Sequence, residues 1–130
     1  MRKPQRDEFD EIFNLIDRAF QYEKAGYNPT SVKMMLGAMS TDDILVMEED
    51  GKIVSNVLTK PYKAYIRGAT LKGAEVSAVA TDERYRGRGF ASALLKEAVH
   101  RMRDKGYDIS TLGGLRDRYS RWGWENGGAI

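Results

Sequence analysis

A strand-to-helix joint rich in arginine and glycine constrains this chain more than any other segment. The joint reads RYRGRGF (84–90), and it separates the apolar run AEVSAVAT (74–81) from the helical stripe of ASALLKEAVHRM (91–102). A strand that leads through a short loop into a helix is half of a β-α-β unit, whose crossover is almost always right-handed. We therefore expect the next strand-like segment, YDISTL (107–112), to lie parallel to residues 74–81.

The residues before this unit predict two helices and an antiparallel meander. The first helix is indicated by apolar residues at helical spacing, namely Phe9, Ile12, Phe13, Ile16 and Phe20. Residues 31–39 predict a second, shorter helix, and residues 43–58 predict two strands around an Asp50–Gly51 turn. Arg67–Gly68 turns the chain into a third strand. The predicted fold is α/β with a mixed (α+β) sheet, an antiparallel meander followed by a parallel β-α-β crossover, in one domain spanning residues 1–130.

Composition narrows the chemistry. A chain of 130 residues with 42% hydrophobic and 31% charged residues is ordinary for a globular protein. The absence of cysteine excludes disulfides, thiolate catalysis and zinc–thiolate sites, and a single histidine, His100, excludes a multi-histidine metal site. The net charge of +2 is too small to argue for nucleic acid by itself. With no membrane-length apolar run and no export signal at the start, we expect a soluble cytoplasmic protein.

The glycine–arginine joint predicts an anion-binding site. The first turn of a helix carries backbone N–H groups without partners and about half a positive charge. Gly87 and Gly89 leave those groups accessible, and Arg84, Arg86 and Arg88 add positive charge around them. This arrangement suits a diphosphate, whose oxygens can accept hydrogen bonds from successive amides.

Other interpretations of the joint stay open. It lacks the Lys-Ser/Thr end of an ATP-binding P-loop and the three-glycine spacing of a dinucleotide-binding loop. The glycines could merely permit a tight turn, with the arginines exposed to solvent and without a ligand. The Arg-Gly dipeptides beside Tyr85 and Phe90 could also belong to an RNA-binding segment. Such segments usually repeat and lie in disordered tails, whereas this one joins two predicted elements.

The joint resembles the signature of the GNAT superfamily of N-acetyltransferases, Arg/Gln-x-x-Gly-x-Gly/Ala between a strand and a helix. Residues 84–89 match it, and Tyr119-Ser120-Arg121-Trp122-Gly123-Trp124 is similar to the family's late Tyr-x-Lys/Arg-x-Gly-aromatic element. The resemblance extends from the first helix to Trp124. VATDERYRGRGFASALL together with RYSRWGWE looks most similar to the branch that contains the aminoglycoside-acetylating "enhanced intracellular survival" proteins and their single-domain relatives.

This resemblance implies a site for acetyl-coenzyme A and none for a metal. In the family the joint holds the pyrophosphate, which would here assign Arg84, Arg86, Gly87, Arg88, Gly89 and Phe90, the last mainly through its backbone. The preceding strand offers main-chain groups to the pantetheine arm and the thioester, and the matching positions are Ser77, Val79 and Thr81. The Val79 amide would polarise the acetyl oxygen as charge develops on it.

Acetyl transfer to an amine also needs two proton movements. The amine, with a pKa of roughly 10, must lose a proton before it attacks, and coenzyme A leaves as a thiol or stabilised thiolate. Tyr119 matches the family tyrosine that protonates the leaving group, although its ring could simply pack in the core. Glu75 lies four residues before Val79, so strand alternation predicts a shared face and makes Glu75 a candidate base. Ordered water or a terminal carboxylate is the alternative base, and Glu75 could be merely solvated. His100 falls well past its helix start and is expected at the surface.

Two departures from the family pattern affect these expectations. The family's first strand would have to lie in MRKPQ (1–5), and only NGGAI (126–130) follows the late aromatic element, where many relatives continue with a last strand. Either the sequence is a piece of a longer protein, or the last strand is short or supplied by a second copy. An unpaired sheet edge favours association, which predicts a homodimer.

The acceptor is not identified by the sequence. Its wall should come from the two helices and residues 21–32, with Tyr22, Tyr27 and the methionines of residues 31–39, although methionines more often pack in the core. Trp122 and Trp124 could stack on a substrate but more often such residues cover a core. The protein is interpreted as an N-acetyltransferase acting by direct attack of a small amine or peptide N-terminus, with neither nucleic acid nor membrane as partner. A non-catalytic coenzyme A-binding GNAT module of a larger protein and a basic RNA-binding module are the alternatives.

Overall fold

A four-stranded mixed sheet forms the centre of the molecule. The computed structural model describes residues 1–21, 24, 26, 28–113 and 119–125. The sheet order is β1-β2-β3-β4, formed by Ile44–Glu49, Lys52–Ile66, Ala69–Thr81 and Ile109–Leu112. The first three strands pair antiparallel, whereas β3 and β4 pair in parallel. The predicted meander and the predicted parallel crossover are both confirmed.

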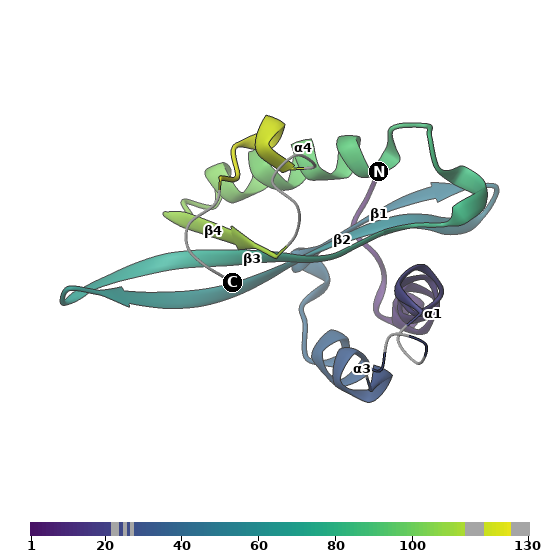
Figure 1. Cartoon of the computed structure of the whole chain (residues 1–130), viewed down its shortest axis with the longest axis horizontal. Helices are drawn as coiled ribbons and strands as arrows, with labels where there is room; N and C mark the ends of the chain where they lie inside the picture. Colours follow the sequence, from purple (N-terminus) through teal and green to yellow (C-terminus); the bar gives the residue numbers. More distant parts are fainter. Residues whose placement is uncertain (22–23, 25, 27, 114–118, 126–130) are drawn as a thin grey trace.

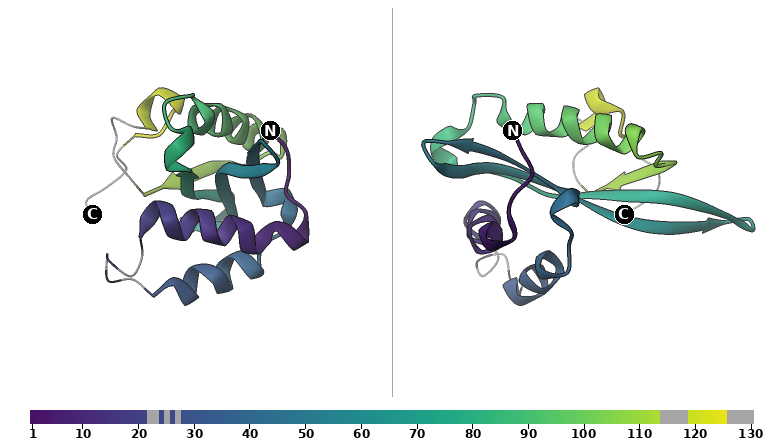
Figure 2. Two further views of the ribbon diagram at one scale, coloured as in Figure 1. Left: turned by 90° about the vertical axis from the view of Figure 1, so that its right-hand side faces the viewer. Right: turned by 180° about the vertical axis from the view of Figure 1, so that it is seen from behind.

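Helices cover both faces of this sheet (Figures 1 and 2). Helices α1 (Phe9–Phe20) and α3 (Pro29–Gly37) pack on one face, and α4 (Phe90–Asp104) packs on the other. Because side chains are buried on both faces, six consecutive residues of β2, 53–58, are buried directly after the exposed Lys52. Phe20 departs from the predicted stripe, since it is 44% exposed at the end of α1.

The N-terminal segment touches the sheet at one point. Arg2 forms an isolated antiparallel bridge with Val46 of β1, in which each backbone N–H donates to the other residue's carbonyl at 3.0 and 2.9 Å. The first strand of the family pattern is therefore represented by a single bridge within residues 1–5. The segment in which a last strand was considered, residues 126–130, lies outside the described residues. No helix in the described ranges is long and apolar enough to cross a membrane.

The pairing of β2 with β3 contains a β-bulge near the end of β3. The pairs on either side of the shift are Leu58 with Ser77 and Asn56 with Ala80. Val57 therefore stands opposite both Ala78 and Val79. Ala78 has a φ of 48°, in the left-handed region that residues with a Cβ rarely adopt. The bulge reverses the alternation of side chains along the last residues of β3.

Candidate functional site

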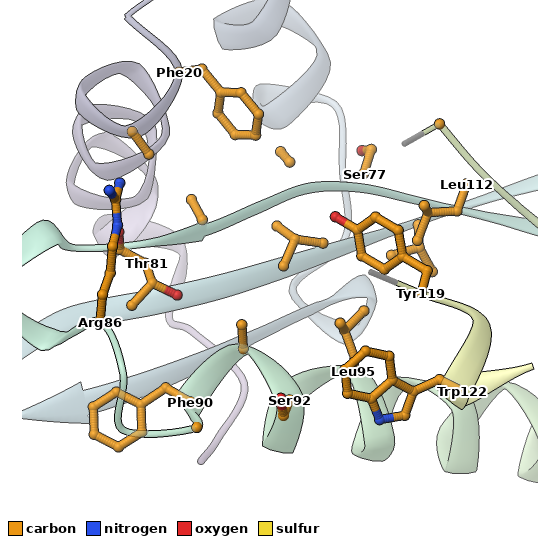
Figure 3. Close-up of a pocket in the computed structure, with 18 of the residues that line it drawn as sticks. Phe20, Ser77, Thr81, Arg86, Phe90, Ser92, Leu95, Leu112, Tyr119 and Trp122 are labelled. Carbon is orange, nitrogen blue, oxygen red and sulfur yellow. The ribbon is translucent and has the colours of Figure 1, made fainter. Parts of the chain in front are cut away.

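A cleft of about 1020 Å³ opens where the end of β3 meets the start of α4 (Figure 3). Its walls come from the end of α1, the second half of β3, the glycine–arginine joint, the first turns of α4, the end of β4 and residues 119, 121 and 122. Nine predicted site residues line it: Glu75, Ser77, Val79, Thr81, Arg86, Gly87, Gly89, Phe90 and Tyr119. The fold thus brings together residues that lie more than forty positions apart in the sequence.

The start of α4 presents unpaired backbone donors to the cleft. Gly87 and Gly89 have φ angles of 81° and 79°, and a Cβ on either would meet no atom within 4 Å. The helix makes its first backbone hydrogen bond from Ala93 N–H to Gly89 O, at 3.0 Å. The amides of residues 90–92 precede that bond, and these residues line the cleft. With the positive end of the helix dipole and no acidic residue in the first turn, this corner can accept a diphosphate.

The three arginines of the joint differ in position. Arg86 lines the cleft, and its Nε donates to Thr81 O at 3.3 Å. Arg84 instead pairs with Asp82, and Arg88 lies over the ring of Tyr85 at 5.1 Å from the centroid. Arg84 and Arg88 are not among the residues that line the cleft. Their contact with an anion therefore stays a prediction, while Arg86 already stands at the mouth.

Asp82 anchors the joint, and sequence reasoning did not identify it. Its carboxylate accepts from the backbone N–H of Arg84 at 3.0 Å and lies 3.6 Å from the guanidinium of Arg18 in α1. The hydrogen bond from the Arg84 amide, and then that from the Arg84 side chain, hold the pKa of Asp82 below its usual range. An aspartate directly after a strand and before a helical turn is an N-cap signal that could have identified it.

The bulge separates Glu75 from Val79. Ala74, Val76 and Val79 all pack in the α4 cluster, although two of them precede the bulge and one follows it. Side chains alternate along a strand, so Glu75 points away from the α4 face that its neighbours Ala74 and Val76 share. Because Val79 also lies on the α4 face, Glu75 and Val79 lie on opposite faces. The predicted shared face is wrong, because an extra residue interrupts the alternation. Glu75 still lines the cleft, on the side of β3 that faces α1.

Tyr119 both packs in the core and faces the cleft. It is 8% exposed within the α4 cluster, and Figure 3 shows its hydroxyl oxygen pointing into the cleft. Trp122 and Trp124 pack against the same cluster, and Trp124 Nε1 donates to Ser110 Oγ at 3.3 Å. This supports the interpretation that the tryptophans cover the core. Trp122 also lines the cleft.

The remaining candidate residues lie elsewhere. His100 is at the surface, as predicted, where it lies 3.3 Å from Asp104 of the next helical turn. Tyr22 and Tyr27 fall outside the described residues. Of the methionines in residues 31–39, Met34 is 72% exposed, and Met39, beyond the end of α3, is buried. Within the described ranges, no three acidic or histidine side chains gather as metal ligands would.

Comparison with known proteins now identifies the family. The model of the acetyltransferase (GNAT) domain family matches residues 1–127. The chain belongs to the GNAT acetyltransferase family. This places the glycine–arginine joint and the late aromatic element within one GNAT domain, and the fold matches that of a solved GNAT acetyltransferase.

Individual relatives agree with this assignment. The uncharacterized N-acetyltransferase YhbS of Escherichia coli is 30% identical over 92 residues, which are 71% of this chain and 50% of that protein. A GNAT family acetyltransferase from Brucella melitensis, solved in complex with acetyl-CoA, superposes with a TM-score of 0.79 at 23% identity, covering 96% of this chain and 81% of that chain. A probable N-acyltransferase from Enterococcus faecalis V583 gives 0.78 at 23% identity, with 94% and 31% covered. The GNAT domain thus spans about half the length of the curated relative and a third of the Enterococcus protein.

Proposed function

We propose that this GNAT domain transfers the acetyl group of acetyl-coenzyme A to a primary amine by direct attack. The observation that carries the proposal is the open first turn of α4, with three amides before the first helical hydrogen bond and Arg86 beside them. A diphosphate is the part of acetyl-coenzyme A that such a corner suits. The Brucella relative of the same fold, solved with acetyl-CoA, supports this choice of ligand.

The described residues fit this co-substrate along the cleft. The amides of residues 90–92, with Gly87, Gly89 and Arg86, would hold the pyrophosphate, and the exposed Arg84 and Arg88 would act only if they turned toward it. The end of β3 would hold the pantetheine arm through Ser77, Val79 and Thr81. Ser77 Oγ is a buried atom with no hydrogen-bond partner among the described residues, which suits a contact with a ligand amide. Acetyl-coenzyme A supplies an activated thioester when bound.

Two residues of the cleft carry the proton movements in this proposal. A new C–N bond forms as the thioester C–S bond breaks. The protonated amine gives up two protons in all, one before it attacks and one from its nitrogen as the amide forms. Glu75, on the side of β3 that faces α1, accepts the first directly or through water, and the second restores the proton that Tyr119 gives to the sulfur. The Val79 N–H stabilises the oxyanion, and Tyr119 donates its hydroxyl proton to the leaving sulfur. The absence of cysteine agrees with direct attack without an acyl-enzyme.

Finer placements extend the proposal. The joint and the late aromatic element favour the aminoglycoside-acetylating branch of the family. The names of the reported relatives identify GNAT acetyltransferases without assigning them to this branch. We infer one domain for residues 1–130, because one sheet carries a core cluster on each face. A cytoplasmic location, a homodimer, and a small amine or peptide N-terminus as acceptor are further parts of the proposal.

A thiol-release assay with acetyl-coenzyme A tests the function. The protein is offered aminoglycosides, polyamines, amino acids and peptide N-termini, and stoichiometric coenzyme A release with one class would identify the acceptor class. Calorimetric binding of acetyl-coenzyme A without turnover on any amine would favour the non-catalytic module. Absence of binding, together with salt-sensitive affinity for RNA, would overturn the proposal in favour of the RNA-binding alternative.

A further inference from the structure

We propose that Asn56 is a positioning residue that aims the Val79 N–H into the cleft by holding the carbonyl oxygen of Ala78. The inference rests on the proposed function, because it concerns the donor that would stabilise the acetyl oxyanion. Asn56 lies on β2, outside the residues that line the cleft, and acts through the bulge of β3.

Two buried polar side chains stand at the bulge. Apart from Tyr119, Ser55 and Asn56 are the only buried polar residues in the described part of the protein, and both are fully buried. Asn56 Nδ2 donates to Ala78 O at 2.8 Å, and Ser55 Oγ donates to Ala80 O at 2.9 Å. These carbonyls flank Val79, where the register of β2 and β3 shifts. Side chains of β2 thus bind the carbonyls at the point where the regular ladder is interrupted.

Because the peptide group is planar, the hydrogen bond from Asn56 to the Ala78 carbonyl also sets the direction of the Val79 N–H. All described peptide bonds are trans, and in a planar trans peptide the C=O and N–H groups point in opposite directions. The Ala78 carbonyl points toward Asn56, so the N–H of Val79, in the same peptide group, points away from it. The last pair between β3 and β4 is Val76 with Leu112, so β4 does not pair with Val79. Val79 itself lines the cleft on that side.

The position of Asn56 leaves one buried polar atom unsatisfied within the described part of the chain. Its Oδ1 is buried and has no hydrogen-bond partner among the described residues. The opposite orientation of the amide would bring Oδ1 against the Ala78 oxygen, so it offers no relief. An apolar residue of similar volume would remove this acceptor but leave the Ala78 carbonyl without the donor at 2.8 Å. The left-handed φ of Ala78 adds a second local cost. Both costs occur at the bulge, which sets the direction of the peptide group between Ala78 and Val79.

The first test compares Asn56→Leu with Val46→Ala. Leucine keeps the volume and removes the donor, while Val46 pairs with Asn56 in the β1–β2 register and is fully buried, so its truncation disturbs the same core without touching the hydrogen bond. With the acceptor found in the amine panel, we expect Asn56→Leu to lower kcat on the order of 100-fold, the loss typical of one oxyanion donor. Coenzyme A affinity should stay within about twofold. An equal effect of Val46→Ala, or an unchanged kcat in Asn56→Leu, would overturn the inference.

The second test needs no variant. In wild-type protein we expect the Val79 amide resonance to shift on adding acetyl-coenzyme A and to shift much less with coenzyme A, which lacks the acetyl oxygen. Equal shifts with acetyl-coenzyme A and coenzyme A would contradict the inference that the Val79 N–H points toward the acetyl oxygen. In Asn56→Leu the difference between the two ligands should disappear. Failure of the proposed function looks different, because wild-type protein would then either bind neither ligand or bind acetyl-coenzyme A without turnover on any amine of the panel.

Discussion

Arg86 Nε donates a hydrogen bond to the carbonyl oxygen of Thr81, the last residue of β3, at 3.3 Å. This bond spans the joint and fixes the stem of the arginine beside the mouth of the cleft. The remaining guanidinium nitrogens can pair with an anion on the cleft side. Among the three arginines of the joint, the geometry therefore favours Arg86 as the charged partner of a phosphate.

Substituting Arg86 should weaken coenzyme A binding. Arg86→Ala removes a charge-assisted hydrogen bond at an exposed position, and we expect about a tenfold higher Kd by calorimetry, equivalent to about 1.4 kcal/mol. Raising the salt concentration should reduce the difference. Arg103→Ala, at the far end of the same helix, serves as the control and should leave Kd unchanged. Larger losses in Arg84→Ala or Arg88→Ala than in Arg86→Ala would contradict this ranking.

A side chain at Gly87 should block the anion corner. Gly87→Glu places bulk and negative charge into space that is now open, and we expect no measurable binding of acetyl-coenzyme A by calorimetry. Gly68→Glu is a matched control, because Gly68 has a φ of 80° and equally open surroundings in the β2–β3 turn. The two variants carry similar backbone strain, so a shared loss of binding would point to misfolding. Normal affinity in Gly87→Glu would remove the site assignment.

The Tyr119 hydroxyl should contribute to turnover more than to affinity. Tyr119→Phe keeps the ring that packs in the α4 cluster and removes the acid. We expect kcat to fall about 10- to 100-fold with little change in the KM for acetyl-coenzyme A, since the thiol leaves fairly readily without an acid. Tyr107→Phe, on a half-buried tyrosine against the same cluster, is the control. Wild-type kcat in Tyr119→Phe would assign proton delivery to water.

The sequence was sufficient for much of the fold. The Asp50–Gly51 turn has left-handed φ angles of 53° and 74°, as a two-residue hairpin turn requires, and this chemistry is visible in the residue types. The positive φ of Gly87 and Gly89 agrees with the predicted loop before a helix. These features depend on a few neighbouring residues, so local patterns predict them.

The bulge could not be predicted in the same way. Ala78 carries no turn signal, and the side chain that binds its carbonyl belongs to Asn56, a residue 22 positions earlier in the sequence. Strand alternation assumed a regular ladder and therefore placed Glu75 on the face of Val79. The pairing of Arg84 with Asp82 was missed for a related reason, because a cluster of arginines in a sequence does not show which of them is already neutralised.

Glu75 should act on the amine rather than on the co-substrate. Glu75→Gln keeps the shape of the side chain and removes the base, so we expect kcat to fall on the order of 100-fold near neutral pH with unchanged coenzyme A affinity. The variant should recover activity as the pH approaches the pKa of the free amine, roughly 10. Glu83→Gln, in the exposed turn before the joint, is the control. A wild-type pH profile in Glu75→Gln would assign deprotonation to water.

Glu8 should make the stability of the fold sensitive to acid. Its carboxylate accepts two hydrogen bonds from the Arg2 guanidinium, each 2.8 Å, and Arg2 also contacts Glu48 of β1. The side-chain hydrogen bond from Arg2 lowers the pKa of Glu8 from 4.5 to about 2. Because the folded-state pKa lies below the unfolded one, the stabilisation is complete above about pH 4.5 and is lost as the pH falls toward 2.

Glu8→Gln isolates this contribution. Arg2 and Glu8 side chains are 35% and 20% exposed, so solvent screening reduces the pair to about 1 kcal/mol. Urea unfolding should therefore show wild type more stable than Glu8→Gln by that amount at about pH 6, with the two converging by about pH 2. Asp7→Asn is the control, because Asp7 is a neighbouring residue with no cationic partner among the described residues. The difference in unfolding free energy between wild type and Asp7→Asn should be the same at both pH values. A constant gap between wild type and Glu8→Gln across this range would mean that the ion pair does not hold the N-terminal bridge to β1.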